Sequence, residues 1–363
     1  MAVVQGWVGN ASANKGFIIA NSSNTDGVDF TSGVSSNAAT LRPKLSITYT
    51  STTSEPPDTS TAVLLAAGDI ATAADDGGPS DYTKYTGKLL DTLVGNNSGS
   101  TVKIAAIGDL VYPGGEQPDN KFIKLYDPTW GSNGKKKLTA PALGNHDYYF
   151  VDGDVYNVRA PKNYFNYFGS AAGSVTNGVY EGWYSYNLGS WHIIVLNAMC
   201  RDGSGITCDQ ARQLQWLQQD LAANSGKKCT LAYWHHPVNA SGKRYSNQSN
   251  WDYAEDNALD FWKALYAAGA DVILTGHAHY YERLAPLKWD DTADSAKGIR
   301  QFVVGTGGQA GDLNGSAHPQ REAGQGNIAG ILELKLGSGT YSWKYHSALS
   351  WKTWSDSGTG SCH

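Results

Sequence analysis

The chain is organised around one stretch in its last third, Asp271-Val272-Ile273-Leu274-Thr275-Gly276-His277-Ala278-His279. The first half is an apolar run that predicts a buried strand, and the second half is a turn with two histidines one residue apart. Alternation along a strand would place both rings on one face with or without a metal ion, so this pair alone is a weak signal. Its weight comes from similar stretches elsewhere in the chain.

Four other stretches also end an apolar run in polar residues: Gly68-Asp69, Gly108-Asp109, Gly144-Asn145-His146-Asp147 and Trp234-His235-His236-Pro237. Helical patterns lie between the apolar runs, from Tyr82 to Val94, Asp209 to Ala223 and Tyr253 to Ala268. Strands that alternate with helices predict an α/β sheet. Three later segments read as antiparallel strands: Gln301 to Gly305, Gly330 to Leu336 and Thr340 to His346. This mixture predicts an α/β (α+β) fold, a four-layer αββα sandwich of two mixed β-sheets flanked by helices.

Residues 1–50 form a different, all-β segment in this prediction, because short apolar and polar alternations are separated by polar turns. Two stretches, Asn14-Lys15-Gly16-Phe17 and Arg42-Pro43-Lys44-Leu45, resemble the closing third of the secreted β-sandwich modules called DNRLRE domains. Fifty residues do not complete such a sandwich, so we interpret the segment as a truncated module. Residues 51–61 have linker composition, and residues 62–363 then form the main domain.

The composition argues against two classes of partner. Twenty-eight basic against 33 acidic residues give a net charge of −5 without a basic stripe, so nucleic acid is not expected as the main partner. No stretch approaches the apolar length of a membrane span. The N-terminus has no basic region followed by an apolar core, so any export signal is missing from this chain.

The four cysteines, Cys200, Cys208, Cys229 and Cys362, match no zinc-binding spacing and favour two disulfides. Cys200 and Cys208 bracket a loop short enough for a local bridge. The other pair would tie the C-terminus to the strand that begins at Cys229. Such bridges persist in oxidising compartments, so we expect a secreted protein, extracellular or periplasmic, with four buried free thiols as the alternative.

Ligands of α/β sheets gather beyond the carboxyl ends of the strands. Here those ends carry potential metal ligands: Asp69, Asp109, Tyr112, Asn145, His146, His235, His236, His277 and His279. Carboxylates, an amide and imidazoles suit iron, zinc, manganese or cobalt better than an all-oxygen calcium site. So many candidates, with a carboxylate able to bridge, favour two ions. Two ions about 3.5–4 Å apart generate a nucleophile and polarise a phosphoryl oxygen, which is the chemistry of phosphoester hydrolysis.

The same residues resemble the five ordered blocks of the calcineurin-like metallophosphoesterases. The blocks are Gly68-Asp69, Gly108-Asp109-Leu110-Val111-Tyr112, Gly144-Asn145-His146-Asp147, His235-His236-Pro237 and Gly276-His277-Ala278-His279-Tyr280-Tyr281-Glu282-Arg283. The general superfamily has Asp-x-His in the first block, whereas this chain has Ala71 at the third position. Tyr112, three residues after Asp109, stands where purple acid phosphatases place a tyrosinate on a ferric ion. The chain therefore looks like the purple acid phosphatase branch of the bacterial secreted type.

The resemblance implies a role for each site residue. One ion, Fe(III), would be held by Asp69, Asp109, Tyr112 and His279. A second ion, Fe(II), Zn(II) or Mn(II), would be held by Asp109, Asn145, His235 and His277, so that Asp109 bridges. Asn145 and His146 would also contact substrate. His236 stands at a position that varies in the family, and it would either donate to substrate or merely pack. His146 would hydrogen-bond the phosphate or the leaving group, and Asp147 would orient the His146 ring.

The expected function is that of a secreted binuclear phosphatase that hydrolyses small phosphomonoesters by attack of a metal-bound hydroxide on phosphorus. The general acid is not identified, because Val238 to Asp252 lacks the histidines of plant and mammalian relatives. Arg244, Tyr245 and Asn247 are candidate phosphate contacts there, and a solvated loop is the favoured alternative. One alternative is a phosphodiesterase or nucleotidase on the same metals. Another is a glycan-binding surface protein that works through residues 1–50 and carries a vestigial esterase domain. We expect His192 to be a core residue and weigh His318 as a lid residue against a structural one.

Overall fold

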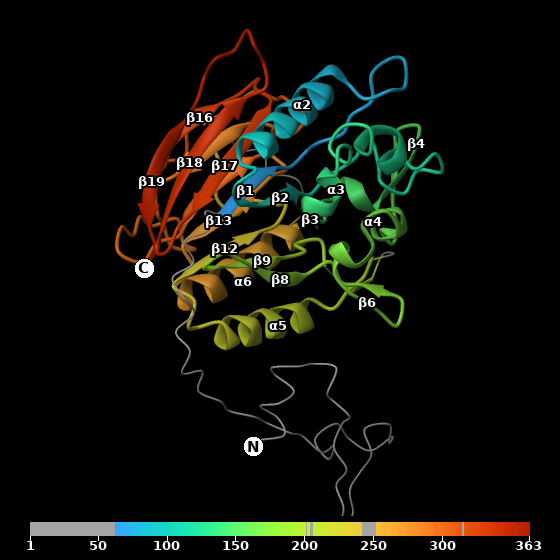
Figure 1. Cartoon of the computed structure of the whole chain (residues 1–363). Coiled ribbons are helices and arrows are strands. Elements are labelled where there is room, and N and C mark those ends of the chain that lie inside the picture. Colours follow the sequence, from blue (N-terminus) through green and yellow to red (C-terminus); the bar gives the residue numbers. More distant parts are fainter. Residues whose placement is uncertain (1–61, 201, 204–205, 242–251, 314–315) are drawn as a thin grey trace, which may run out of the picture. The chain divides into compact units, whose positions relative to one another are not determined.

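The computed structural model describes residues 62–363, except 201, 204–205, 242–251 and 314–315. The expected β-module, the linker and the candidate contacts Arg244, Tyr245 and Asn247 lie outside the described residues. Within them, two β-sheets pack face to face and helices cover both outer faces (Figure 1). The predicted four-layer αββα sandwich is confirmed.

The first sheet has six strands in the order β19-β18-β17-β1-β2-β3. Their bounds are β1 Ala62–Ala67, β2 Thr101–Ile107, β3 Thr139–Ala142, β17 Gly330–Leu336, β18 Thr340–Ser347 and β19 Ser357–Ser361. Strands β1, β2 and β3 are parallel, and β17, β18 and β19 continue the sheet antiparallel to their neighbours. β1 is buried along its whole length, which explains its uninterrupted apolar sequence.

The second sheet has seven strands in the order β16-β14-β15-β13-β12-β9-β8. Their bounds are β8 Tyr184–Leu188, β9 Trp191–Val195, β12 Cys229–Tyr233, β13 Val272–Thr275, β14 Tyr281–Leu284, β15 Arg300–Val304 and β16 Arg321–Gln325. The four central strands β9, β12, β13 and β15 are parallel, whereas β8, β14 and β16 pair antiparallel at the two edges. The parallel strands of both sheets therefore bring their carboxyl ends to one side of the sandwich.

Three long helices lie on the outer faces: α2 Asp81–Asn96 over the first sheet, and α5 Gln210–Ala223 with α6 Asp252–Ala267 over the second (Figure 1). Their bounds agree with the sequence patterns to within two residues. The side chain of Ser80 caps α2 by accepting from the Thr83 amide, and the side chain of Asp209 caps α5 by accepting from the Arg212 amide. Each cap satisfies a backbone N–H that the first turn of a helix leaves free.

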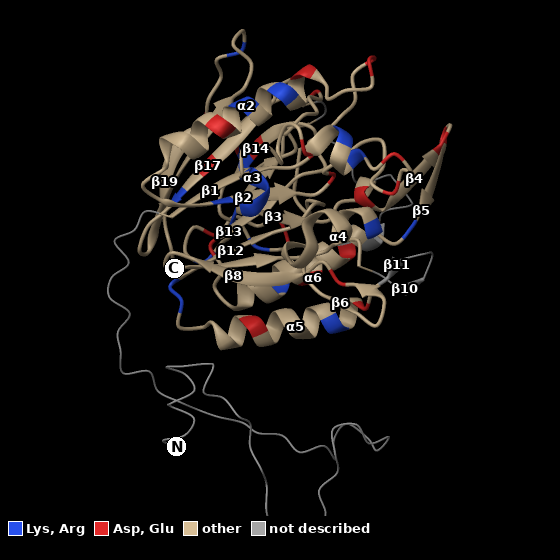
Figure 2. Cartoon of the chain, turned by 45° about the vertical axis from the view of Figure 1, so that its right-hand side comes forward, with Lys and Arg blue, Asp and Glu red and all other residues tan. Residues whose placement is uncertain are grey.

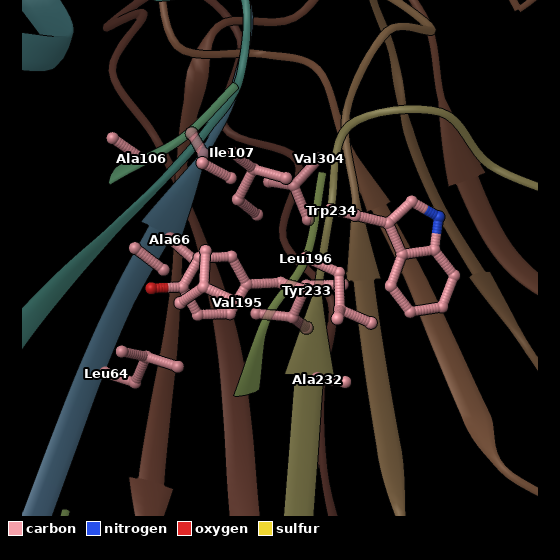
Figure 3. Close-up of a cluster of buried hydrophobic side chains, with 14 of the residues drawn as sticks. Leu64, Ala66, Ala106, Ile107, Val195, Leu196, Ala232, Tyr233, Trp234 and Val304 are labelled. Atoms are coloured by element: carbon pink, nitrogen blue, oxygen red, sulfur yellow. The ribbon is translucent and has the colours of Figure 1, made fainter. Parts of the chain in front are cut away.

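The core lies between the two sheets, where side chains from both inner faces meet (Figure 3). Leu64 and Ile107 come from the first sheet, and Tyr233, Val195 and Val304 come from the second; all five are fully buried. The hydroxyl of Tyr233 reaches across and donates to the carbonyl oxygen of Ala140 at 2.8 Å. This packing fixes one sheet against the other, and with it the loops that follow the strands.

The predicted antiparallel direction of Gln301 to Gly305 is only half right. β15 pairs antiparallel with β14 but parallel with β13, so it completes the central parallel part of the second sheet. A strand's residue pattern reports which face is buried and carries no information about the direction of its neighbours. The sequence reading also omitted β16, β19 and the short hairpin of β4 Tyr149–Asp152 and β5 Val155–Val158.

Smaller elements complete the described chain: α3 Lys135–Leu138, α4 Lys162–Phe168, β6 Val175–Thr176, β7 Val179–Tyr180, β10 Asp202–Gly203, β11 Ile206–Thr207, a π-helical turn Phe122–Tyr126 and 3-10 turns His146–Tyr148 and Gly169–Ala172. Along the described part, no helix is both long enough and apolar enough for a membrane crossing. Lys and Arg are interspersed with Asp and Glu over these elements (Figure 2).

Both predicted disulfides are present. Cys200 bonds Cys208 across eight positions, and Cys229 bonds Cys362 across 133 positions. The second bond ties the C-terminus to β12, and the His363 amide donates to Oδ1 of Asp271, the residue before β13, at 2.8 Å. Free thiols, the alternative weighed from the sequence, are excluded.

Candidate active site

The five blocks meet where the parallel strands end. Three of their residues, Asp69, Asp109 and His277, have positive φ angles of 59°, 50° and 64°. The left-handed conformation is costly for residues with a side chain, and it concentrates at functional sites. Two backbone contacts join the first loops, since the amides of Asp69 and Ile70 donate to the carbonyl oxygens of Gly108 and Asp109 at 3.0 Å.

Two glycines make this convergence possible. Gly108 has φ 72°, and a Cβ there would lie 2.6 Å from Nδ1 of His235. A Cβ on Gly144 would lie 2.3 Å from the Asp109 amide nitrogen. Contacts this short are sterically forbidden, so only glycine lets the second and third blocks pack against each other and against His235.

The first group of predicted ligands surrounds the hydroxyl of Tyr112. This oxygen lies 2.8 Å from Oδ1 of Asp69, 3.1 Å from Oδ2 of Asp109 and 3.3 Å from Nε2 of His279. Nε2 of His279 is also 3.1 Å from Oδ1 of Asp69. The structure therefore brings together all four residues expected at the first metal position.

The second group lies on the other side of Asp109. Nε2 of His235 is 3.1 Å from Oδ2 of Asp109, and the rings of His235 and His277 are 5.1 Å apart. Nδ1 of His235 donates to the carbonyl oxygen of Ile107 at 2.8 Å, which leaves Nε2 as the ligand atom. Asn145 is 5% exposed, and its Oδ1 has no hydrogen-bond partner among the described residues. Oδ2 of Asp109 thus lies between the two groups.

The electrostatics of the centre follow from burial and from its two carboxylates. Burial lowers the pKa of His235, but Asp109 and Asp69 outweigh it and raise the pKa to about 9. Burial and the neighbouring His235 lower the pKa of His277 to about 3. Burial together with the charges of Asp109 and Asp69 raises the pKa of Tyr112 well above its ordinary value. Without metal ions, Tyr112 is therefore a neutral phenol next to the carboxylates of Asp69 and Asp109.

These residues fit a pair of transition-metal ions. The carboxylates of Asp69 and Asp109 are 0% and 1% exposed, and buried charge on this scale requires compensation. The partnerless Oδ1 of Asn145 is a further buried acceptor that a cation would satisfy. A phenol, an amide oxygen, carboxylates and imidazoles are the mixed set that iron, zinc and manganese accept.

His146 lies beside the first group, with its ring centroid 4.3 Å from that of Tyr112. Its backbone amide donates to Oδ1 of Asp109 at 2.7 Å, and its Nδ1 lies 2.6 Å from the carbonyl oxygen of Pro113. Asp147 was expected to orient this ring. The structure gives that role to Pro113, because the Asp147 carboxylate is fully buried and accepts from the amides of Leu110 and Gly144. Asp147 therefore ties the second block to the third.

His236 belongs with the second group. Its ring lies 4.3 Å from that of His277 and 4.9 Å from that of His235, and one ring nitrogen of each lies within 4.8 Å of the others. Burial and the two neighbouring histidines lower the pKa of His236 well below its ordinary value. A neutral, buried imidazole at this position can donate to a substrate oxygen or accept a cation.

The remaining sequence candidates have structural surroundings. His192 is 2% exposed and its Nε2 lies 2.7 Å from Oδ2 of Asp220, as expected of a core residue. His318 is buried, and its Nε2 lies 2.5 Å from Oδ1 of Asp291. These surroundings are those of a structural residue, one of the two roles weighed for it. The turn at Gly305 also lies beside the centre, since a Cβ there would be 2.9 Å from Oδ2 of Asp69.

Sequence reasoning missed the main-chain partners of the site. The carbonyl oxygens of Ile107 and Pro113 orient His235 and His146, and no residue pattern marks a carbonyl for such a role. The ring of Tyr149 also lies at the site, 5.1 Å from that of His146.

Comparison with known proteins agrees with this geometry. Residues 62–281 match the calcineurin-like phosphoesterase family. Over 177 residues the chain is 27% identical to purple acid phosphatase 15 of Arabidopsis thaliana, covering 46% of this chain and 30% of that protein. It is 27% identical over 281 residues to Fe(3+)-Zn(2+) purple acid phosphatase 12 of the same plant, covering 68% of this chain and 54% of that protein.

Among solved structures, the purple acid phosphatase from yellow lupin seeds superposes with a TM-score of 0.60 at 16% identity, covering 84% of this chain and 55% of that one. The chain thus spans between about a third and about half of the length of these relatives. The sandwich and the ordered blocks agree with the family match, and the chain belongs to the calcineurin-like phosphoesterase family, in its purple acid phosphatase-like branch.

Proposed function

We propose that this chain is a secreted, binuclear metal-dependent phosphatase that hydrolyses small phosphomonoesters. One observation carries the proposal: Oδ2 of Asp109 is 3.1 Å both from the hydroxyl of Tyr112 and from Nε2 of His235. A single carboxylate oxygen between two ligand groups is suited to bridging two ions. Asp69, Asp109, Tyr112 and His279 would hold one ion, and Asp109, Asn145, His235 and His277 would hold the other.

The two ions, when bound, would lower the pKa of a water molecule and polarise the phosphoryl oxygen. The ligand set with a phenol favours Fe(III) beside Tyr112, with Fe(II), Zn(II) or Mn(II) at the second position. The chain's own contribution is to hold these groups. Hydrogen bonds from backbone amides fix the carboxylates, since His277 N donates to Oδ2 of Asp69 at 2.8 Å and His146 N donates to Oδ1 of Asp109.

His146 is the side chain we assign to the substrate. Because Nδ1 donates to the Pro113 carbonyl oxygen, the ring can donate a second hydrogen bond only from a protonated Nε2. An imidazolium at this place would stabilise the phosphate and give a proton to the departing alcohol oxygen. Asn145 and His236 would donate to phosphate oxygens from the side of the second group. An extracellular or periplasmic location is supported by the two disulfides.

The test is metal analysis of the purified native chain together with hydrolysis of 4-nitrophenyl phosphate and bis(4-nitrophenyl) phosphate. Two metal ions per chain and faster turnover of the monoester are expected. Less than one bound transition-metal ion per chain would contradict the binuclear assignment. Faster turnover of the diester would favour the phosphodiesterase reading on the same centre.

A further inference from the structure

The β4–β5 hairpin stands directly beside the proposed catalytic histidine. Its base is fixed by three hydrogen bonds: the amides of Glu116 and Arg159 donate to the carbonyl oxygens of Tyr149 and Tyr148 at 2.9 and 2.8 Å, and Nε2 of Gln117 donates to the carbonyl oxygen of Val151 at 3.0 Å. From this base the two strands project from the body of the protein (Figure 2). The hairpin is therefore held at one end and open to solvent at the other.

The register of the hairpin places two tyrosines on one face. Tyr149 pairs with Val158 and Val151 pairs with Tyr156, so these four side chains share a face. The rings of Tyr149 and Tyr156 are 5.1 Å apart and nearly perpendicular. Both rings are steeply inclined to the His146 ring, with centroids 5.1 Å away for Tyr149 and 6.0 Å away for Tyr156. We call Tyr149, Tyr156 and His146 the aromatic wall.

The aromatic wall leads from the centre to solvent. Tyr112, a proposed metal ligand, contacts His146 at 4.3 Å, and His146 contacts the two tyrosines. Tyr149 is buried, whereas Tyr156 is 52% exposed. An aromatic ring left half-exposed next to a site needs an explanation, because burial of such a ring is strongly favourable.

The charges around the hairpin restrict what can lie against it. Asp152 and Asp154 are exposed at its turn, so the outer end is acidic. The guanidinium of Arg159 lies 3.6 Å from the ring centre of Phe150, which pairs with Asn157 on the opposite face. The hairpin face that carries Tyr149 and Tyr156 thus has no cation among its own residues, and an anionic leaving group would meet the acidic turn.

We propose that Tyr156 binds the leaving group of the substrate and selects phosphomonoesters of uncharged aromatic alcohols. This inference rests on the proposed function, because it places the phosphate at the centre and the alcohol along His146. The planar ring of such an alcohol would extend from the phosphate past His146. There it can pack against the exposed face or edge of Tyr156. Tyr156 is a specificity residue here and takes no part in bond breaking.

The experiment compares benzyl phosphate with cyclohexylmethyl phosphate in the native, metal-containing protein. The two alcohols have the same reach and similar basicity, so a difference between them reports recognition of the ring. Tyr156→Ala should lower kcat/KM for benzyl phosphate by about threefold to tenfold, mainly through KM, as expected for loss of one aromatic pair. The value for cyclohexylmethyl phosphate should change by less than about twofold, the low end of the same range.

Two further variants serve as controls. Tyr156→Phe keeps the ring and should keep the preference for benzyl phosphate. Trp351→Ala removes another exposed aromatic ring, which contacts Tyr85 of α2, and should leave both substrates unchanged. Equal losses for both substrates in Tyr156→Ala, with weaker inhibition by inorganic phosphate, would mean that Tyr156 merely supports His146 and would overturn the inference.

Binding of benzylphosphonate and cyclohexylmethylphosphonate separates this inference from the proposed function, because neither compound has an ester bond. A binding preference for the benzyl compound that Tyr156→Ala abolishes supports the aromatic wall even if no ester is hydrolysed, in which case the phosphatase proposal alone fails. Turnover of both esters without a preference in kcat/KM or in phosphonate binding overturns the inference and leaves the phosphatase proposal intact.

Discussion

Nε2 of His235 lies 3.1 Å from Oδ2 of Asp109, although the two residues follow strands of different sheets. Asp109 comes after β2 of the first sheet, and His235 comes after β12 of the second. The contact therefore exists only because the sheets pack face to face with their parallel strands ending on the same side. Any change that shifts one sheet against the other would pull apart the ligands of each proposed metal position, because both positions take residues from both sheets.

Asp109→Asn should reduce both metal content and turnover. The substitution keeps the size of the side chain but removes the charge that both ligand groups share. Loss of an outer partner of a ligand already costs about 10- to 100-fold in metal affinity or activity, so kcat/KM should fall by at least roughly 100-fold. Metal analysis and hydrolysis of 4-nitrophenyl phosphate measure this. Asp119→Asn, which removes only surface ion pairs with Lys121 and Lys124, should behave like wild type.

Tyr112→Phe should abolish visible absorption in the iron-containing protein. The phenol oxygen, 2.8 Å from Asp69, is the group that would give a ferric ion its charge-transfer colour, and phenylalanine lacks it. Tyr164→Phe is the matched control, because the Tyr164 hydroxyl is buried but donates to the Pro141 carbonyl oxygen. A visible band that survives in Tyr112→Phe and disappears in Tyr164→Phe would show that the chromophore lies elsewhere.

His277→Gly should be more stable than His277→Ala by about 1 kcal/mol. Both variants lose the imidazole, so the comparison isolates the backbone, which has φ 64° at this residue. The left-handed conformation costs residues with a Cβ about 1–2 kcal/mol and costs glycine almost nothing. Denaturant unfolding of the two metal-free variants measures the difference. Equal stability would show that the loop relaxes to negative φ once the ring is removed.

Glu116 should make the protein less stable as the pH rises from about 4.5 to about 7. Burial raises its pKa from 4.5 to about 7, against the opposing hydrogen bond from the Asn163 amide. Between these values the folded chain holds the proton that the unfolded chain has lost. The free energy of unfolding therefore falls as the pH rises, with a slope that corresponds to at most about one proton. Glu116→Gln cannot ionise and should gain stability relative to wild type across this range. A pH-independent difference in melting temperature would contradict the assignment.

The two disulfides should contribute unequally to stability. Cys229 and Cys362 are separated by 133 positions and Cys200 and Cys208 by eight; Cys362 is partly buried and the other three cysteines are buried. The chain-entropy estimate gives roughly 5 kcal/mol for the long loop and roughly 2.5 kcal/mol for the short one. The paired variants Cys229→Ser with Cys362→Ser, and Cys200→Ser with Cys208→Ser, should follow this order in denaturant unfolding. The reverse order would show that the long bridge closes a loop already constrained in the unfolded chain.

Much of the fold and of the candidate site could be predicted from the sequence, because these features depend on local chemistry. Apolar runs and helical spacings predicted the sandwich and the three long helices to within two residues, because periodicity reports burial directly. Cys200 and Cys208 are near neighbours in the chain, and pairing them left one partner for Cys362. The sequence blocks, such as the one that contains Asp109 and Tyr112, also show which side chains follow the strands. Those residue types are sufficient to predict a mixed oxygen and nitrogen ligand set.

The tertiary structure alone decided how those side chains are held. Which way β15 runs, and that β19 extends the first sheet, depend on pairing between distant segments that strand patterns do not encode. The orienting partners of His235 and His146 are carbonyl oxygens, which every residue possesses, so only the backbone path distinguishes those of Ile107 and Pro113. The placement of Tyr156 beside His146 likewise follows from hairpin register. The sequence by itself determined which groups are available, and the packing of two sheets determined which atoms of those groups meet.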